Sequence, residues 1–145
     1  MSDRENYILL VEDNPDDVEL TQLAFKKNNF ANKIRVVEDG QKAIDFLIGD
    51  KKNGVEKYGF PELILLDLKL PKLNGHEVLK EIKGRDKLKR IPVVILTSSQ
   101  EEEDIIKGYD LGANSYVRKP VDYKDFVKVV NNMGIYWLAI NKNIL

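Results

Sequence analysis

Three short apolar runs constrain the fold more than any other feature of the chain, because none of them alternates with polar residues. They are Tyr7 to Val11, Leu63 to Leu66 and Val93 to Leu96. A strand that is apolar at every position needs cover on both faces, which is typical of a parallel sheet between two layers of helices. Segments of helical length separate the runs, so each can return to the sheet through a crossover helix. The pattern predicts an α/β fold.

Two weaker strand signals raise the number of predicted strands to five. Ile34 to Val37 stands before a Glu-Asp-Gly turn, and Ser115 to Arg118 follows the turn Gly112-Ala113-Asn114. Right-handed crossovers leave few arrangements, of which a doubly wound sheet in the order 2-1-3-4-5 is the commonest at this length. We therefore expect one domain over residues 1–145 with a five-stranded parallel sheet in that order.

Local signals predict where helices begin and which faces they bury. Asn14-Pro15 is an N-cap followed by proline at the first helical position, and Ser99 to Glu102 fits a capping box. The polar stretch from Gly49 to Pro61 is expected to be a surface excursion. The residues expected on buried helical faces are Leu20, Leu23, Ala24, Val78, Leu79, Ile82, Phe126, Val130, Met133, Trp137 and Ile140.

Composition and charge exclude several kinds of function. The chain has no cysteine and one histidine, which removes thiol catalysis, iron–sulfur clusters, disulfides and the usual zinc sites. A formal net charge of -1 provides no basic field for nucleic acid. The apolar runs are too short to span a membrane and the first residues are polar, so we expect no membrane span, no signal peptide and a cytoplasmic location.

Polar residues follow four of the predicted strands, at the points where those strands end. They are Glu12-Asp13, Asp67, Thr97-Ser98 and Arg118-Lys119-Pro120. The carboxyl ends of parallel strands meet at one edge of an open α/β sheet, where ligands bind. Three carboxylates at this edge would repel one another unless they share a cation. With oxygen ligands and neither histidine nor cysteine nearby, Mg²⁺ is the cation that we expect.

A lysine and a hydroxyl facing such a metal site are suited to a phosphoryl group, whose transfer needs positioning and neutralisation of charge. Asp67 would be the nucleophile and form an acyl phosphate, while Glu12 and Asp13 hold the metal. Any single one of these residues is explained equally well as a turn former or helix cap. Their joint occurrence at the ends of separate strands favours the functional interpretation.

Four segments of the chain form a joint pattern: Ile8 to Asp13, Leu65 to Pro71 with Asn74-Gly75, Val94 to Ser98, and Gly112 to Pro120. Together they resemble the receiver domain of two-component response regulators and are similar to the bacterial chemotaxis response regulator. The resemblance covers nearly the whole chain. It implies a flavodoxin-like (βα)5 fold and a signalling phosphoprotein rather than an enzyme, with self-catalysed phosphoryl transfer and autodephosphorylation as its only reactions.

The resemblance also implies how the acidic edge works. Asp67 accepts a phosphoryl group from a phosphohistidine of a sensor histidine kinase. Mg²⁺ lies on Asp13, Asp67 and the backbone carbonyl of Lys69, and Glu12 contributes through water. The chain departs from the family pattern at Glu12, where aspartate is common, and at Lys69, whose side chain would lie beside the phosphoryl group and alter dephosphorylation.

The resemblance implies roles for three further residues, of which Thr97 and Tyr116 form the switch and Lys119 and Thr97 act with Asp67 in catalysis. Lys119 pairs with the phosphoryl oxygens, Thr97 hydrogen-bonds them, and Tyr116 changes rotamer between inactive and active states. By the same resemblance a cis bond before Pro120 would help to aim the lysine. The signal is expected on the face of the fourth helix, fifth strand and fifth helix, which is also our candidate homodimer interface.

Two residues outside the acidic edge carry expectations of their own. The single histidine, His76, stands at a helix start and is expected to face solvent without a catalytic role. Gly108 lies inside the predicted fourth helix and suits either an element that shifts or close packing.

Other interpretations stay open at this point. An Mg²⁺-dependent aspartyl-phosphate phosphatase also uses an aspartate nucleophile, but it needs a second aspartate where Lys69 stands. A flavin carrier of the same fold needs a Ser/Thr/Gly-rich turn after the first strand, where Glu12 to Pro15 stands. A stand-alone receiver would signal to an unknown downstream protein. The stretch Gly49 to Pro61 and the Tyr136-Trp137-Leu138 ending are similar to stand-alone receivers of phytochrome-type kinases.

Overall fold

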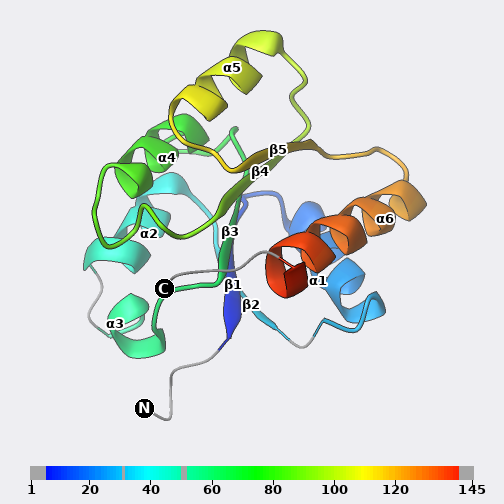
Figure 1. The fold of residues 1–145 in the computed structure, drawn as a ribbon, viewed down its shortest axis with the longest axis horizontal. Coiled ribbons are helices and arrows are strands. Elements are labelled where there is room, and N and C mark those ends of the chain that lie inside the picture. The colour runs from blue at the N-terminus through cyan, green and yellow to red at the C-terminus, as the bar shows by residue number, and fades with distance from the viewer. Residues whose placement is uncertain (1–5, 31, 50–51, 141–145) are drawn as a thin grey trace.

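One parallel sheet in the order β2-β1-β3-β4-β5 runs through the centre of the protein (Figure 1). The computed structural model describes residues 6–30, 32–49 and 52–140. The strands are β1 (Tyr7–Val11), β2 (Lys33–Val37), β3 (Leu63–Leu66), β4 (Val93–Thr97) and β5 (Ser115–Arg118). All of them pair in parallel, so the predicted doubly wound, flavodoxin-like sheet is confirmed.

Helices cover both faces of this sheet. They are α1 (Pro15–Lys27), α2 (Gly40–Ile44), α3 (Val55–Tyr58), α4 (Gly75–Lys83), α5 (Glu102–Asp110) and α6 (Tyr123–Gly134), with the π-helical turns η1 (Asp45–Gly49) and η2 (Ile135–Ile140). α1 packs against α6 on one face, α2 packs against α4 on the other, and α5 contacts α4 and β5 (Figure 1). No helix in the described part of the chain is long and apolar enough to cross a membrane.

The side chains of β1 enter two separate hydrophobic cores, one on each face of the sheet. Tyr7, Leu9 and Val11 lie in the core beneath α2 and α4. Ile8 and Leu10 lie in the core beneath α1 and α6. None of the five is more than 2% exposed, and burying such a side chain contributes about 1.5–3 kcal/mol. Burial on both faces is the physical reason why the strand has no polar alternation.

The predicted helical faces are largely confirmed. Those buried in a core are Ala24, Val78, Leu79, Ile82, Phe126, Val130, Met133 and Trp137, and Leu20 is partly buried. The prediction for Leu23 is wrong, because Thr21, Ala24 and Phe25 form the inner face of α1 and leave Leu23 45% exposed. The side chain of Ile140 lies outside the described part of the chain.

Tertiary contacts overturn one local prediction and add detail to another. The expected capping box is wrong: α5 begins at Glu102 without a side-chain cap. The Ser99 hydroxyl donates to the Asp104 carboxylate at 2.6 Å and accepts from the amide of Glu101, the residue before the helix, at 3.4 Å. The excursion from Gly49 to Pro61 contains α3, because Val55 and Tyr58 pack against the core beneath α2 and α4.

Lys83, the last residue of α4, connects this helix by hydrogen bonds to the segments that precede β4 and β5. Its ammonium donates to the carbonyl oxygens of Lys89 at 3.1 Å and Ile91 at 2.9 Å. It also donates to Asn114 Oδ1 at 3.0 Å, which accepts from the amide of Val93 at 2.9 Å. Burial lowers the pKa of Lys83 to about 8. Lys83 therefore links the starts of β4 and β5 to α4.

We predict that Lys83→Met destabilises the fold by about 1–3 kcal/mol near neutral pH, because three acceptors lose their donor. The pKa of Lys83 is about 8 in the folded protein against 10.5 ordinarily, so the unfolded chain binds more protons between these values. The free energy of unfolding of the wild type should therefore rise with pH relative to the variant. Urea denaturation at about pH 7 and about pH 9.5 measures this gap. An unchanged gap would contradict the prediction.

Candidate functional site

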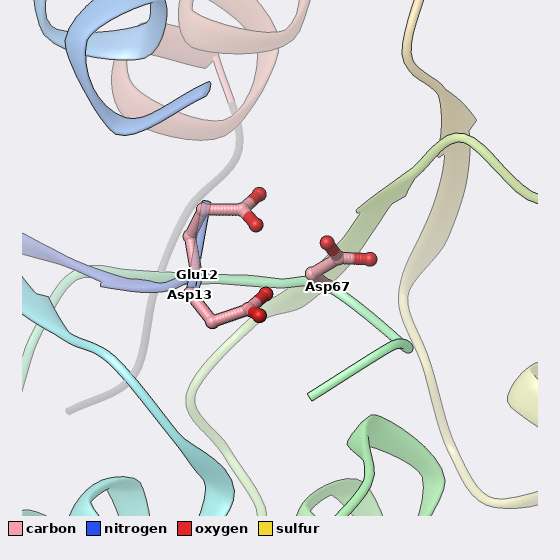
Figure 2. A group of neighbouring side chains, drawn as sticks. All are labelled: Glu12, Asp13 and Asp67. Atoms are coloured by element: carbon pink, nitrogen blue, oxygen red, sulfur yellow. The ribbon is translucent and has the colours of Figure 1, made fainter. Parts of the chain in front are cut away.

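The carboxylates of Glu12, Asp13 and Asp67 lie close together at the carboxyl edge of the sheet, as the strand ends predict. One oxygen from each lies within 4.8 Å of the others. Figure 2 shows them approaching one another from the ends of β1 and β3. The backbone ladder continues past both strands, because the Glu12 amide donates to Val37 and the Asp67 amide donates to Val11. Sheet pairing thus fixes the backbone positions of Glu12 and Asp67.

The Lys119 ammonium lies between three carboxylates. It donates to Glu12 Oε1, to Asp17 Oδ2 at 2.9 Å and to Asp67 Oδ2 at 3.1 Å. Its side chain is 8% exposed, and its amide continues the ladder by donating to the Thr97 carbonyl at 2.7 Å. The predicted cis bond is wrong, since the bond from Lys119 to Pro120 is trans. The side chain reaches the carboxylates from this trans backbone.

Burial and mutual interaction together shift the pKa values of these groups in different directions. Burial raises the pKa of Glu12 to about 7, against the hydrogen bond from Lys119, and the Asp67 charge adds to the increase. Burial also raises the pKa of Asp67, but the Lys119 charge and hydrogen bonds with its neighbours outweigh burial and lower it overall. For Lys119, burial lowers the pKa, yet the carboxylates outweigh it and the ammonium stays charged. The site holds a charged lysine next to an ionised Asp67.

Asp17 is a site residue that the strand ends do not predict. It lies in the first turn of α1, where Asn14 Oδ1 accepts from the amides of Asp16 at 2.9 Å and Asp17 at 3.4 Å. The predicted N-cap at Asn14 is thus confirmed, and it sets the rotation of the helix that brings Asp17 to Lys119. The signal in the sequence is the helix start, but the partner Lys119, which follows β5, comes from the tertiary fold.

Thr97, Ser99 and Tyr116 form a hydrogen-bonded path that leads away from the carboxylates. Thr97 is fully buried at the end of β4, and its Oγ1 accepts from the Ser99 amide at 3.4 Å. The Ser99 carbonyl accepts from the Tyr116 hydroxyl at 2.9 Å. Ser98 is exposed. The structure therefore connects the predicted switch residues Thr97 and Tyr116 through Ser99, while a rotamer change of Tyr116 stays a prediction.

Lys69 contacts Asp67 through its backbone. The Lys69 amide donates to Asp67 Oδ1 at 3.3 Å and its side chain is exposed, while metal binding by its carbonyl stays a prediction.

The prediction that His76 faces solvent is wrong. His76 is 8% exposed, and its Nε2 lies 3.2 Å from the carbonyl oxygen of Asp104. It is buried because the first turn of α4 packs against α5.

Two glycines permit close approach around the site. A Cβ on Gly75 would lie 2.3 Å from the Asp67 carbonyl oxygen, so this glycine lets α4 begin directly against the strand end that carries Asp67. A Cβ on Gly108 would lie 2.7 Å from Cδ1 of Ile95. This contact agrees with close packing, the second of the two expectations, while a shift of the helix stays a prediction.

The donor set at this edge fits a hard divalent cation. Glu12, Asp13 and Asp67 offer carboxylate oxygens, the ligands that such cations prefer. Asp13 is exposed and Glu12 and Asp67 are buried, so an ion at this position would take ligands from both water and protein. Since only one lysine opposes several carboxylates here, a divalent cation would lower the repulsion among them.

Fold and site together define a class of protein: a receiver, which carries an aspartate, an acidic pair, a hydroxyl and a lysine at the carboxyl edge of a 2-1-3-4-5 sheet. The chain belongs to the response regulator receiver domain family of two-component signalling, whose family pattern matches residues 8–131.

Relatives with known names support this assignment. Response regulator Rcp1 of Synechocystis sp. is 43% identical over 141 residues, which cover 95% of each chain. The probable methanogenesis regulatory protein FilR2 of Methanothrix harundinacea is 40% identical over 136 residues, covering 94% of this chain and 86% of FilR2. Both relatives are matched over most of their length.

Solved structures agree with the fold. The phosphorylated cyanobacterial phytochrome response regulator RcpA matches with a TM-score of 0.90 and 38% identity, over 97% of this chain and 99% of RcpA. The Mn²⁺-bound form of Rcp1 matches with a TM-score of 0.88 and 41% identity, over 97% and 99% of the two chains.

We predict that Lys119→Met destabilises the protein by about 3–5 kcal/mol near neutral pH, because buried carboxylates lose their counter-charge. The pKa of Asp67 is lowered in the folded state, so its stabilising effect is present above its ordinary 3.8 and is lost as the pH falls through the folded value. The gap between wild type and variant should therefore shrink in acid. Urea denaturation measures it, with Lys124→Met at an exposed lysine as the control. Equal stability of the two variants would contradict the prediction.

Proposed function

We propose that the protein is a phosphoacceptor: Asp67 takes a phosphoryl group from a phosphohistidine of a sensor histidine kinase in an Mg²⁺-dependent reaction. The observation that carries this proposal is the position of the Asp67 carboxylate, which lies beside the acidic pair Glu12 and Asp13 and 3.1 Å from the Lys119 ammonium. The Mn²⁺-bound form of the relative Rcp1 supports a divalent ion at such a site.

In the proposed reaction an Asp67 carboxylate oxygen attacks phosphorus and the new O–P bond forms. The P–N bond to the histidine breaks, and its electron pair stays on the imidazole nitrogen. Mg²⁺ bound by Glu12, Asp13 and Asp67 would supply neutralisation of the phosphoryl charge. Lys119 supplies a positive charge for the phosphoryl oxygens, and its depth in the site makes that charge more effective than in water.

The signal leaves the site through Thr97. A phosphoryl group adds about -1.5 to -2 of charge, and a hydrogen bond from the Thr97 hydroxyl to it contributes roughly 1.5–3 kcal/mol. Full reversal of a two-state equilibrium needs about 5.5 kcal/mol, so this bond alone produces a graded shift. Movement of Thr97 would disturb the hydrogen bond that the Ser99 amide donates to Thr97 Oγ1. A shift of Ser99 would in turn disturb the hydrogen bond from the Tyr116 hydroxyl to the Ser99 carbonyl.

The protein acts as a partner for other proteins rather than as an enzyme with turnover. A phosphatase of the aspartyl-phosphate type needs an acid two residues after its nucleophile, and Lys69 stands there with an exposed side chain. The kinase partner is of the histidine kinase class. Similarity to RcpA, described as a phytochrome response regulator, supports a phytochrome-like kinase. The downstream protein would bind the face formed by α5, β5 and α6, which are the predicted fourth helix, fifth strand and fifth helix.

We predict a mass increase of one phosphoryl group when the protein is incubated with acetyl phosphate and Mg²⁺, because the small donor needs only the site itself. Asp67→Asn should show no increase, and removal of divalent ions with EDTA should suppress it in the wild type. Intact-mass spectrometry measures all three samples. Equal modification of Asp67→Asn and the wild type would refute Asp67 as the acceptor.

We also propose a homodimer through the α5–β5–α6 face, since Ile106 and Tyr109 of α5 are 52% and 50% exposed. With acetyl phosphate present, the mass from light scattering should rise towards a dimer as concentration increases. Ile106→Glu should stay monomeric. Leu23→Glu, at a 45% exposed leucine on α1, is the control that should still dimerise. A monomer mass independent of concentration would contradict the proposal.

A further inference from the structure

The Lys119 ammonium has three N–H donors, and each has a carboxylate acceptor in this structure. Two acceptors, Glu12 and Asp67, belong to the acidic group that fits a metal. The third, Asp17 at 2.9 Å, comes from α1 and is not part of that group. The contact is therefore an additional restraint on the lysine.

The three contacts differ in how easily they can be given up. The Glu12 side chain is 3% exposed and that of Asp67 is 10% exposed, so a broken bond would leave a buried carboxylate without a donor. The Asp17 side chain is 28% exposed, and water can replace the lysine there. When a phosphoryl group forms on Asp67, the donor to Asp67 passes to a phosphoryl oxygen. Lys119 can donate to a second phosphoryl oxygen at the lowest free-energy cost when it releases Asp17.

We propose that Asp17 is a positioning residue that holds Lys119 in the resting site and restrains phosphoryl transfer to Asp67. This inference rests on the proposed function. While Asp17 occupies one donor of Lys119, that donor and part of its charge are withheld from the incoming phosphoryl oxygens. Release of the lysine accompanies transfer, so weakening the Asp17 contact accelerates the reaction.

The test compares Asp17→Asn with Asp16→Asn. Asp16 is the preceding residue of the same first turn and is exposed, so both variants remove one negative charge near the start of α1. The substrate is acetyl phosphate with Mg²⁺: the Asp67 O–P bond forms, the bond from phosphorus to the acetyl oxygen breaks, and acetate leaves with the electron pair. Asp17→Asn should be phosphorylated roughly two- to fivefold faster than Asp16→Asn, the range expected for a partly exposed ion pair.

Structural damage would slow the reaction, whereas release of Lys119 speeds it. Asp17→Glu restores a carboxylate and should return the rate to that of the wild type. Should Asp17→Asn fail to fold, Asp17→Ser removes the same carboxylate and should show the same acceleration. A rate for the Asp17 variant equal to or below that of Asp16→Asn would overturn the proposal.

A second measurement needs neither donor nor metal. In protein with ¹⁵N-labelled lysine, the protons of the Lys119 ammonium should exchange with water faster in Asp17→Asn than in Asp16→Asn or the wild type. Equal exchange would overturn the restraint by Asp17 even if the rates differ. A wild type that takes no phosphoryl group on Asp67 would refute the proposed function, while this measurement would still test the contact between Asp17 and Lys119.

Discussion

The ion pairs of Lys119 are the interaction on which the functional edge depends. One ammonium joins carboxylates from the end of β1, the start of α1 and the end of β3, while its own backbone follows β5. Buried carboxylates at this spacing would otherwise raise one another's pKa or separate. The pair energies are partly cancelled by the desolvation of each charge, so the cluster is better regarded as a device that fixes geometry than as a source of stability.

This geometry is available because the sheet positions the backbone of each member independently. The backbone amides of Glu12, Asp67 and Lys119 donate hydrogen bonds to the carbonyl oxygens of Val37, Val11 and Thr97 respectively. Each hydrogen-bond ladder thus continues one residue beyond its strand. The apolar strands behind them are buried on both faces and are the most rigid part of such a fold. A rigid sheet can therefore hold groups that repel one another.

The sequence predicts strands and strand ends well, and it predicts side-chain partners across the fold poorly. The runs around Leu9 and Leu65 place Glu12 and Asp67 because a strand end is a local property. The roles of Asp17 and His76 depend on the rotation of α1 and on how α4 packs against α5, and neither is encoded by a local pattern. Ser99 illustrates the same limit, since its hydroxyl could cap a helix but instead bonds the side chain of Asp104.

Glu12 and Asp17 contact the same ammonium from different elements of the fold. Glutamate has one methylene more than aspartate, and its buried carboxylate contacts Lys119 directly. The lysine then lies within reach of α1, where Asp17 provides the outer contact. Three carboxylates thus contact one ammonium and Asp13 lies beside two of them, an excess that favours a divalent cation and opposes an incoming phosphoryl group. In the proposed reaction, a bound divalent cation would reduce this excess of negative charge. Release of Lys119 from Asp17 would then bring the ammonium to the phosphoryl oxygens.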